Sequence, residues 1–250
     1  LMLPGTSRPP KLVVFDLDHT LIACDATILW TEFLYEKKIV TDPIWRQYDR
    51  DMVKSYAKGV LDIRDFCRKH AGAFRCIPEE KLHALAQEFA KKKIAPLIFP
   101  DGKKWAKNAL QANIPACVLS ASAAFIVKPI AKLFGLTDAM GIELAFKDGF
   151  CTGEIVGIPT FQEGKVERLS QRLAEAGIGF EDVLFFTDSR NDLPLAERAG
   201  YTVCVNPDAV LESAARKNGW KVAEWKLSLR TQMTAQVDAK GVPETQTVRS

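Results

Sequence analysis

The 250-residue sequence has little of several features that mark specialised classes of protein. No stretch approaches the ~20 consecutive apolar residues of a membrane-spanning helix, so we expect no membrane partner. The formal net charge of +3 is too small to predict nucleic-acid binding, and the basic run at 91–93 is typical of a solvated helix face. Residues 1–10 lack the apolar core of a signal peptide and are predicted to be a loose leader.

Paired cysteines are also missing. None of the cysteines forms a C-x-x-C pair, and a chain of this length does not need disulfides to stabilise its core. We therefore predict that the thiols are reduced and packed as small apolar groups, and that the protein is cytoplasmic. The six cysteines are Cys24, Cys67, Cys76, Cys117, Cys151 and Cys204.

The sequence does have the composition of an ordinary globular protein, with 47% hydrophobic and 26% charged residues. Residues 11–15 form a short apolar run rich in valine, which is the pattern of a strand buried on both faces. Similar runs alternate with segments of helical periodicity, which predicts an α/β fold with a doubly wound, Rossmann-like parallel sheet. The later runs lie at 114–120, 182–188 and 201–206, and the helical segments at 102–112, 124–133, 165–176 and 193–199.

A long helical stretch interrupts this alternation after the first strand. Its apolar residues recur at three- and four-residue spacing, which predicts a helical cap that folds over the strand ends. Between Ile142 and Ile158, alternating apolar and polar residues around a central glycine predict a hairpin. The final residues are polar and without apolar periodicity. The predicted division is a catalytic core of 11–23 and 97–225, a cap of 24–96, a leader of 1–10 and a disordered tail of 226–250.

Two acidic residues follow the first predicted strand, in the sequence DLDHT. Asp16 and Asp18 are two positions apart, and side chains at this spacing in an extended chain point the same way. We expect them to emerge together at the carboxyl end of a central strand, where ligand sites of open parallel sheets lie. A solvated loop is the alternative, although packing gives no reason for two adjacent acids there.

Other polar residues occupy corresponding places further along the chain. Ser120 ends the second run and Lys165 opens a helix; Asp188 ends the third run, with Asn191 and Asp192 in the loop that follows. Each has an ordinary alternative, as a helix cap, a surface lysine or a turn residue. Because all of them should meet at one edge of the sheet, we predict a catalytic site.

This order of residues resembles that of a known family. DLDHT matches the D-x-D-x-T signature of the haloacid dehalogenase superfamily, and the serine, the lysine and the paired aspartates follow in the order of its other motifs. The resemblance covers about residues 11–225, and the position of the helical insert is similar to that in the phosphoserine-phosphatase-like branch. It implies a hydrolase that removes phosphate from a small soluble ester.

The resemblance also implies a cofactor and roles. Asp16 and Asp188 would offer side-chain oxygens to Mg²⁺ and Asp18 its backbone carbonyl, while Asp192 would act on this metal site indirectly. Lys165 would neutralise the phosphate and Asp16, while Ser120 and backbone amides after Asp16 would hold the phosphoryl oxygens. Asp16 would attack phosphorus to form an aspartyl-phosphate, and Asp18 would protonate the leaving group and then activate water. The dehalogenases of the superfamily lack this second acid, so its presence favours a phosphatase.

The substrate is less clearly indicated. Asp25 lies where phosphoserine phosphatases have an acid that binds the substrate's amino group, but an N-cap is an equal alternative. Arg64 could bind a carboxylate or phosphate, although a surface ion pair is at least as expected. Where phosphoserine phosphatases have two glycines after the motif serine, this chain has alanine and serine, which argues against phosphoserine and leaves histidinol phosphate as an alternative. The substrate-binding candidates are Asp25, Arg64, Ser120, Ala121 and Asn191.

Two other functions stay open from sequence alone. A phosphotransferase would pass the phosphoryl group from Asp16 to an alcohol instead of water. A non-enzymatic sensor of phosphate ligands would not need a nucleophile beside an acid, so retention of the charged motif residues argues against it. Protein partners and oligomeric state cannot be read from the sequence.

Overall fold

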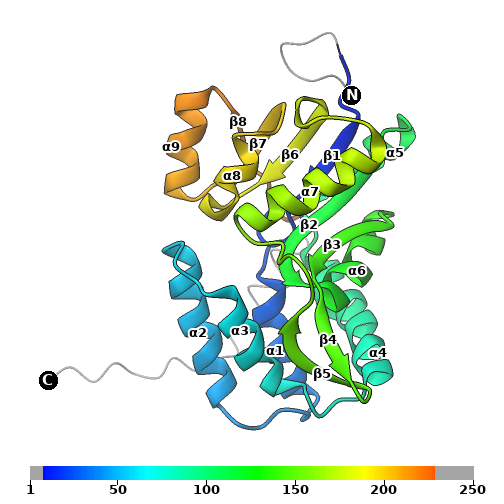
Figure 1. The fold of residues 1–250 in the computed structure, drawn as a ribbon, viewed down its shortest axis with the longest axis vertical. Coiled ribbons are helices and arrows are strands. Elements are labelled where there is room, and N and C mark those ends of the chain that lie inside the picture. Colours follow the sequence, from blue (N-terminus) through cyan, green and yellow to red (C-terminus); the bar gives the residue numbers. More distant parts are fainter. Residues whose placement is uncertain (1–7, 229–250) are drawn as a thin grey trace, which may run out of the picture.

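The computed structural model describes residues 8–228, which are built around a six-stranded sheet (Figure 1). All neighbouring strands are parallel, in the order β3-β2-β1-β6-β7-β8, and helices flank the sheet. The predicted doubly wound α/β class is therefore confirmed. Residues 1–7 of the predicted leader and 229–250 of the predicted tail lie outside the described residues. The strands are β1 (Leu12–Phe15), β2 (Ala116–Ala123), β3 (Asp138–Ile142), β6 (Val183–Thr187), β7 (Tyr201–Val205) and β8 (Lys221–Ala223).

The central strand β1 is buried on both faces because its alternate residues enter different apolar clusters. Val13 and Phe15 pack with residues of α5 and α6, whereas Leu12 and Val14 pack with residues of α7 and α8. This two-sided burial explains the nearly continuous apolar run in the sequence. The helices of this part are α5 (Pro100–Gln111), α6 (Ala124–Ala131), α7 (Glu163–Ala176), α8 (Leu193–Ala196) and α9 (Ala209–Asn218).

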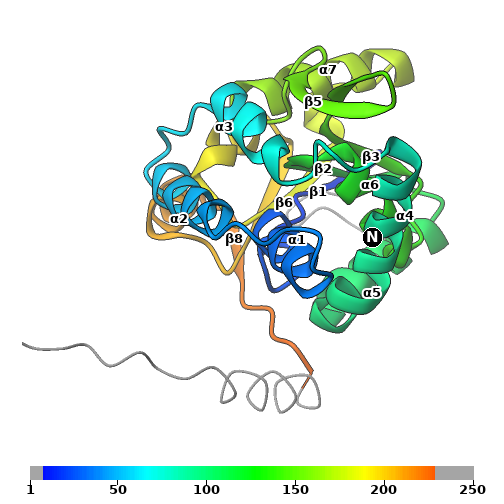
Figure 2. The same cartoon turned by 90° about the horizontal axis from the view of Figure 1, so that it is seen from below.

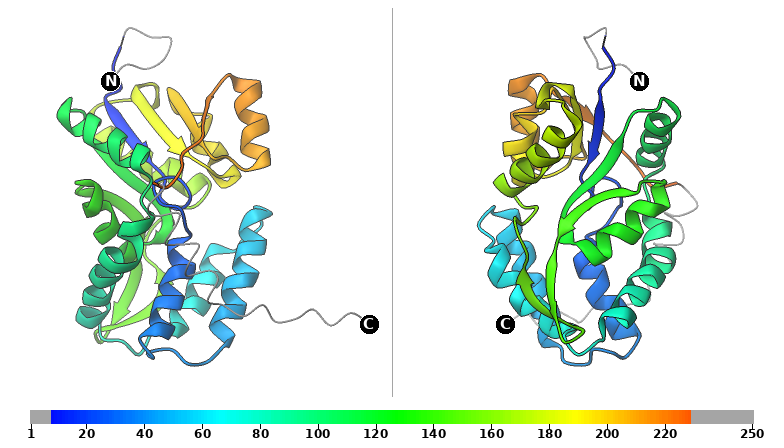
Figure 3. Two further views of the ribbon diagram at one scale, coloured as in Figure 1. Left: turned by 180° about the vertical axis from the view of Figure 1, so that it is seen from behind. Right: turned by 45° about the vertical axis from the view of Figure 1, so that its right-hand side comes forward.

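A second, mainly helical part lies beyond the carboxyl ends of the strands (Figures 1 and 3). Viewed from below, its helices surround a common interior (Figure 2). Trp30 is fully buried there, with its ring centroid 5.4 Å from that of Phe89 and 5.6 Å from that of Phe125. Since Phe125 belongs to α6, this interior is continuous with the core around the sheet. The helices are α1 (Ala26–Glu36), α2 (Ile44–Ala57), α3 (Ile63–His70) and α4 (Glu79–Phe89).

The predicted hairpin consists of β4 (Leu144–Lys147) and β5 (Phe150–Ile155), paired antiparallel. Sequence placed it with the catalytic core, but it packs against the helical part. A Cβ on Gly153 would lie 2.7 Å from the Ala71 side chain and 2.9 Å from the carbonyl oxygen of Cys67, so only glycine permits this close approach. At its tip, the N–H of Glu79 donates to the carbonyl of Gly149 at 2.8 Å.

The connecting segments complete the chain. Strand β2 runs past Ser120 to Ala123, with a register shift against β3. Strands β3 and β8 and helix α9 were not singled out from the sequence. None of the helices within 8–228 is long and apolar enough to cross a membrane. The remaining helical turns are Ala71–Ala73, Ala90–Ile94, Ala95–Leu97, Lys132–Phe134, Phe180–Asp182 and Arg190–Asp192.

Candidate active site

Asp16 and Asp18 lie at the carboxyl end of β1, in a cavity of about 590 Å³ whose other walls come from α1, α2 and α3. The N–H of Asp16 donates to the carbonyl oxygen of Phe186 at 2.9 Å, which extends the strand pairing to this residue. Asp16 is 5% exposed, whereas Asp18 is more open to the cavity. Asp188, which follows β6, lines the same cavity. The structure therefore brings these three acids together.

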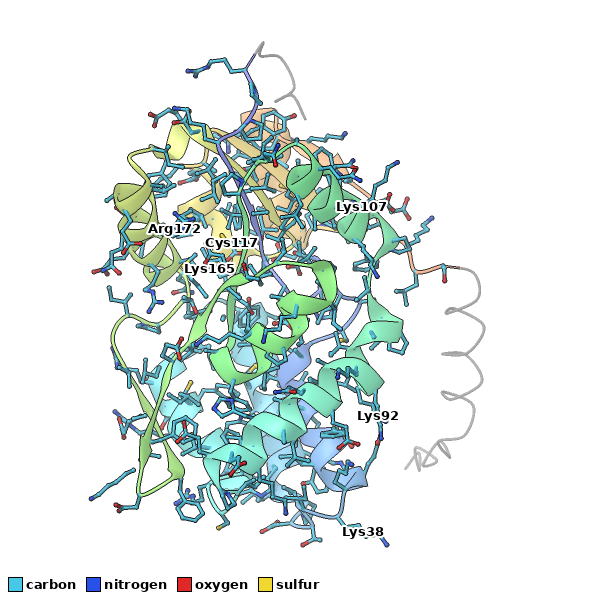
Figure 4. All side chains as sticks on the ribbon, turned by 90° about the vertical axis from the view of Figure 1, so that its right-hand side faces the viewer. Lys38, Lys92, Lys107, Cys117, Lys165 and Arg172 are labelled. Atoms are coloured by element: carbon cyan, nitrogen blue, oxygen red, sulfur yellow. The ribbon has the colours of Figure 1, made fainter. Side chains whose placement is uncertain are left out.

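Lys165 lies behind Asp16 and is 1% exposed. Its Nζ is 2.7 Å from Oδ1 of Asp16 and 2.7 and 2.9 Å from the two carboxylate oxygens of Asp192. Burial lowers the pKa of Lys165, but the two carboxylates outweigh it and hold that pKa above its ordinary value. The lysine therefore stays charged and is not a surface residue. Figure 4 shows it between the sheet and the helical part, at the opposite end of that part from Lys38.

The turn into α7 directs Lys165 toward Asp16. The preceding Gly164 passes so close to Pro159 that a Cβ would lie 1.9 Å from its carbonyl oxygen, and no larger residue fits. Thr160 Oγ1 donates to the carbonyl oxygen of Ser120 at 2.5 Å, which fastens this turn to β2. The lysine is thus positioned by contacts between segments 40 residues apart in the chain.

The other acidic residues of the site are also held by hydroxyl groups. Thr20, fully buried, donates to Asp188 Oδ1 at 3.2 Å and so ties the DLDHT loop to the end of β6. Thr187 Oγ1 donates to Asp192 Oδ2 at 2.7 Å. Asp192 faces Lys165 and Thr187 and does not line the cavity, so any effect it has on a metal ion is indirect.

Burial and crowding of like charges shift the protonation of the cavity acids. Burial raises the pKa of Asp16, although Lys165 partly offsets this, and burial together with Asp16 raises the pKa of Asp188 well above its ordinary value. Burial and the nearby carboxylate of Asp25 raise the pKa of Asp18 to about 6. With a pKa of about 6, Asp18 can carry a proton for part of the time near neutral pH, as a proton donor must.

One backbone N–H and one side chain that the sequence argument missed hold Asp18. Its Oδ1 accepts a bond of 2.6 Å from the N–H of Ala26, and its Oδ2 accepts one of 2.8 Å from Ser122 Oγ. Ser122 Oγ also lies 3.2 Å from Thr27 Oγ1, whereas Ser120 Oγ is 3.4 Å from Asp18. The second serine of the Ser-Ala-Ser sequence was the available signal, because it repeats the first at strand spacing.

Ser120 itself is completely buried at the end of the apolar part of β2. It does not cap a helix, since α6 begins after Ala123, which excludes that alternative. Its Oγ accepts a bond of 3.1 Å from the N–H of Ser122. Ala121 lines the cavity.

Asp25 lies at the start of α1, beside the cavity. As the N-cap of α1 it accepts a bond of 3.0 Å from the N–H of Ile28, and it also lines the cavity. Burial raises its pKa. A desolvated carboxylate at this place favours a cationic group beside it.

The fully buried Ser120 does not line the cavity, and neither do two other predicted substrate-binding residues. Arg64 is exposed on α3, does not line the cavity, and forms no ion pair with any residue of the described chain. Asn191 is 3% exposed, but its side chain is engaged by Tyr56, Ser189 and Gln162. Both corrections have one reason: the sequence gives the position of a residue in an element but not the direction of its side chain.

The donor set fits a magnesium ion. No three His, Cys, Asp or Glu side chains of residues 8–228 gather into a ready metal centre. Asp16 and Asp188, however, are two carboxylates in one cavity, and burial together with the charge of Asp16 raises the pKa of Asp188. Mg²⁺ is commonly bound by one or two carboxylates, with water and substrate phosphate completing its shell.

An apolar wall faces the acids, and the sequence argument did not identify it. Met52, Val53 and Tyr56 of α2, with Ile63 and Phe66 of α3, line the cavity. Their helical spacing was visible in the sequence, but nothing local says which neighbour a helix face meets.

Comparison with known proteins places this geometry in a family. The sequence model of the haloacid dehalogenase-like hydrolases matches residues 13–197. A histidinol-phosphatase of Neisseria meningitidis serogroup C is 35% identical over 220 residues, covering 86% of this chain and 99% of the relative. A phosphoserine phosphatase of Mycobacterium tuberculosis is 26% identical over 234 residues, covering 90% and 75% of the two chains.

Solved structures show the same fold. A protein of unknown function from Bordetella pertussis Tohama I superposes with a TM-score of 0.78 at 31% identity, covering 86% of this chain and 98% of that one. A phosphoserine phosphatase with an analogue of the phospho-aspartyl intermediate superposes with a TM-score of 0.64 at 21% identity, covering 91% and 99%.

Proposed function

The chain belongs to the haloacid dehalogenase-like hydrolases and is a phosphoric monoester hydrolase, and we propose that it cleaves a small soluble phosphate ester through an aspartyl-phosphate on Asp16. The observation that carries this proposal is the buried contact of 2.7 Å between Lys165 Nζ and Asp16 Oδ1, beside Asp18 in one cavity. Lys165 fixes the carboxylate and offsets its charge, so that a phosphate dianion can approach it.

In the first step, a carboxylate oxygen of Asp16 attacks phosphorus while the bond from phosphorus to the leaving oxygen breaks. Asp18 gives its proton to that oxygen and becomes a carboxylate, which Ser122 and the N–H of Ala26 then stabilise by hydrogen bonds. The products are the free alcohol and Asp16 phosphate.

In the second step, Asp18 accepts a proton from water, and the resulting hydroxide oxygen bonds to phosphorus. The bond from phosphorus to Asp16 breaks, and inorganic phosphate leaves. Asp16 is then a carboxylate and Asp18 is protonated, as they were before the first step. Asp16 and Asp188 would hold Mg²⁺, with the Asp18 carbonyl, and the bound ion supplies charge that stabilises the transferring phosphoryl group.

The proposed substrate is a phosphate ester related to an amino acid, of the histidinol phosphate or phosphoserine type. The names of the relatives support this class, and Asp25 supports a substrate with an amino group. We also propose that residues 24–96 act as a cap, with the hairpin of β4 and β5 attached to it, and that the core comprises 11–23 and 97–225. The free thiols of the described chain support a cytoplasmic location.

Asp16→Asn tests the proposal with p-nitrophenyl phosphate and Mg²⁺. Wild type should release phosphate, lose this activity in chelator and regain it with Mg²⁺ but not with Ca²⁺, whose longer bonds and larger shell could engage both oxygens of Asp16. Asp16→Asn should lose more than about a thousandfold in kcat (over ~4 kcal/mol in barrier). If Asp16→Asn retains a tenth of the wild-type rate, Asp16 is not the nucleophile.

A further inference from the structure

The charged side chains around the cavity are strongly biased in sign. No lysine or arginine within residues 8–228 lines it. Lys165 is near, but it lies behind Asp16 and is bound by two carboxylates. His19 lies on the lining but is itself exposed. The acids that line it are Asp16, Asp18, Asp25, Glu32, Asp188 and Asp208. The part of a substrate beyond its phosphate therefore meets carboxylates.

Two arginines near this wall, Arg46 and Arg190, do not line the cavity. Arg46 makes two hydrogen bonds of 2.7 Å to Glu32, and its guanidinium lies 3.8 Å from the ring centroid of Tyr35. Arg190 is partly buried over Gly59. Glu32 is thus compensated by Arg46, whereas Asp25 has no ion pair with any residue of the described chain.

The remaining lining is apolar and spacious. Ile28 of α1, Met52 and Tyr56 of α2, and Ile63 and Phe66 of α3 contribute to it. A volume of about 590 Å³ lies within the range (~300–1,000 Å³) of sites that enclose ligands larger than serine. Such a wall stabilises a substrate through burial of its apolar surface.

We propose that the site selects phosphate esters of cationic amino alcohols that carry an apolar or aromatic group and no carboxylate, and that it discriminates against amino-acid phosphates such as phosphoserine. This inference rests on the phosphatase function proposed above. An ammonium group is favoured beside the unpaired Asp25, and a ring is favoured against α2 and α3. A carboxylate on the leaving group would enter beside Asp18 and Asp25 with no lysine or arginine of residues 8–228 on the lining to meet it, and close like charges destabilise its binding.

A matched pair of substrates tests the discrimination. Phosphoserine and phosphoethanolamine share the phosphate, the amine and the carbon chain, and differ by one carboxylate. We expect kcat/KM for phosphoethanolamine to exceed that for phosphoserine by about tenfold or more, the usual scale of such specificity differences. Histidinol phosphate, which adds a ring, should exceed phosphoethanolamine in turn, and Phe66→Ala should reduce that second ratio. Equal or better use of phosphoserine overturns the inference.

Two substitutions test the same discrimination by changing the protein instead of the substrate. Leu61, which lines the cavity from the loop before α3, can be changed to arginine, with Leu61→Met as the neutral control. Leu61→Arg should raise the ratio of phosphoserine to phosphoethanolamine turnover, and Leu61→Met should not. Arg64→Ala should leave that ratio unchanged; selective loss of phosphoserine turnover would show that this arginine reaches the substrate, and would overturn the inference.

Turnover of p-nitrophenyl phosphate separates the two proposals. If wild type with Mg²⁺ hydrolyses this ester but prefers phosphoserine, the phosphatase function stands and only the selectivity is wrong. If it hydrolyses none of the four esters, the proposed function fails and the selectivity falls with it.

Discussion

The side-chain nitrogen Nδ2 of Asn191 donates a hydrogen bond of 3.0 Å to the carbonyl oxygen of Tyr56, joining the loop after β6 to the last turn of α2. Gln162 Nε2 adds bonds of 3.1 Å to the carbonyl oxygen of Gly59 and to Asn191 Oδ1. Gln162 has a φ of +48°, which non-glycine residues rarely adopt. These hydrogen bonds connect the catalytic edge of the sheet to the end of α2. We call the four residues that make them, Asn191, Tyr56, Gln162 and Gly59, the latch.

Asn191→Ala should loosen this latch. It removes the bond to Tyr56 and leaves Gln162 without one of its acceptors. The contact between the helical part and the edge of the sheet should lose about 1–2 kcal/mol of stability. We expect faster hydrogen exchange at residues 56–62 and a drop of several-fold in kcat/KM, because closure excludes water from the cavity. Asn218→Ala, at the end of α9, is the control. Unchanged exchange at 56–62 would argue against the latch.

Asp18→Asn tests the proton donor separately from the nucleophile. Its amide oxygen can still accept from Ala26, so the loop should keep its shape. Alkyl phosphates, which need protonation of the leaving oxygen, should lose about 100-fold or more in rate, and p-nitrophenyl phosphate much less in the first step. Rapid quenching with the aryl ester should trap phosphate on the protein. Ser122→Ala, which removes the 2.8 Å bond to Asp18, should show the same leaving-group dependence more weakly. Equal losses for both esters would make Asp18 structural.

Lys165→Met should affect stability and activity together. The substitution leaves Asp16 and Asp192 buried without their cation, which costs about 3–5 kcal/mol in the free energy of unfolding. Adding Asp192→Asn removes one of the two uncompensated carboxylates, so the double variant should regain part of the stability but none of the turnover. Urea unfolding and phosphate release measure the two effects, with the exposed Lys128→Met as control. A double variant no more stable than Lys165→Met would contradict this account.

A buried pair in the helical part should make stability depend on pH. Asp49 is 4% exposed, neither of its carboxylate oxygens accepts a hydrogen bond, and burial raises its pKa to about 7. Thr31 and Arg50 lower this pKa in part, while Asp25 and Glu32 raise it. His70 Nε2 lies 3.6 Å from Asp49 Oδ1, and burial lowers the pKa of the histidine to about 4.

The two shifts act in opposite directions. The raised pKa of Asp49 contributes stability that is present below pH ~4 and is lost as pH rises through ~7. The lowered pKa of His70 contributes stability that is present above pH ~6.5 and is lost as pH falls through ~4. Between these limits they largely cancel in wild type.

Asp49→Asn should reveal the dependence of the free energy of unfolding on pH that comes from His70. Relative to wild type, its free energy of unfolding should rise from pH 4.5 to 7.5 by about 3 kcal/mol, since one pKa unit corresponds to ~1.4 kcal/mol. Urea unfolding at several pH values measures this, and the exposed Asp51→Asn on the same helix is the control. Parallel pH profiles for Asp49→Asn and wild type would show that Asp49 does not titrate in this range.

Much of the fold could be predicted because its signals are local. The apolar runs of β1 and β6 lie within a few residues of their observed bounds, since strands buried on both faces must be apolar throughout. Helix α6 was predicted at 124–133 but ends two residues earlier, at Ala131, in a segment that contains Pro129. Strands β3 and β8 were missed because they are short and contain polar or small residues.

By itself, the sequence determined the parallel sheet and the meeting of Asp16, Asp18 and Asp188 at its edge. Strand ends of a parallel sheet share one edge, so residues that follow them are brought together whatever the loops do. Only tertiary structure decided that Asn191 binds Tyr56, that Ser122 holds Asp18 more closely than Ser120 does, and that Arg64 does not line the cavity. The reason is physical: the direction of each side chain follows from packing between elements distant in sequence, and periodicity within one element does not encode it.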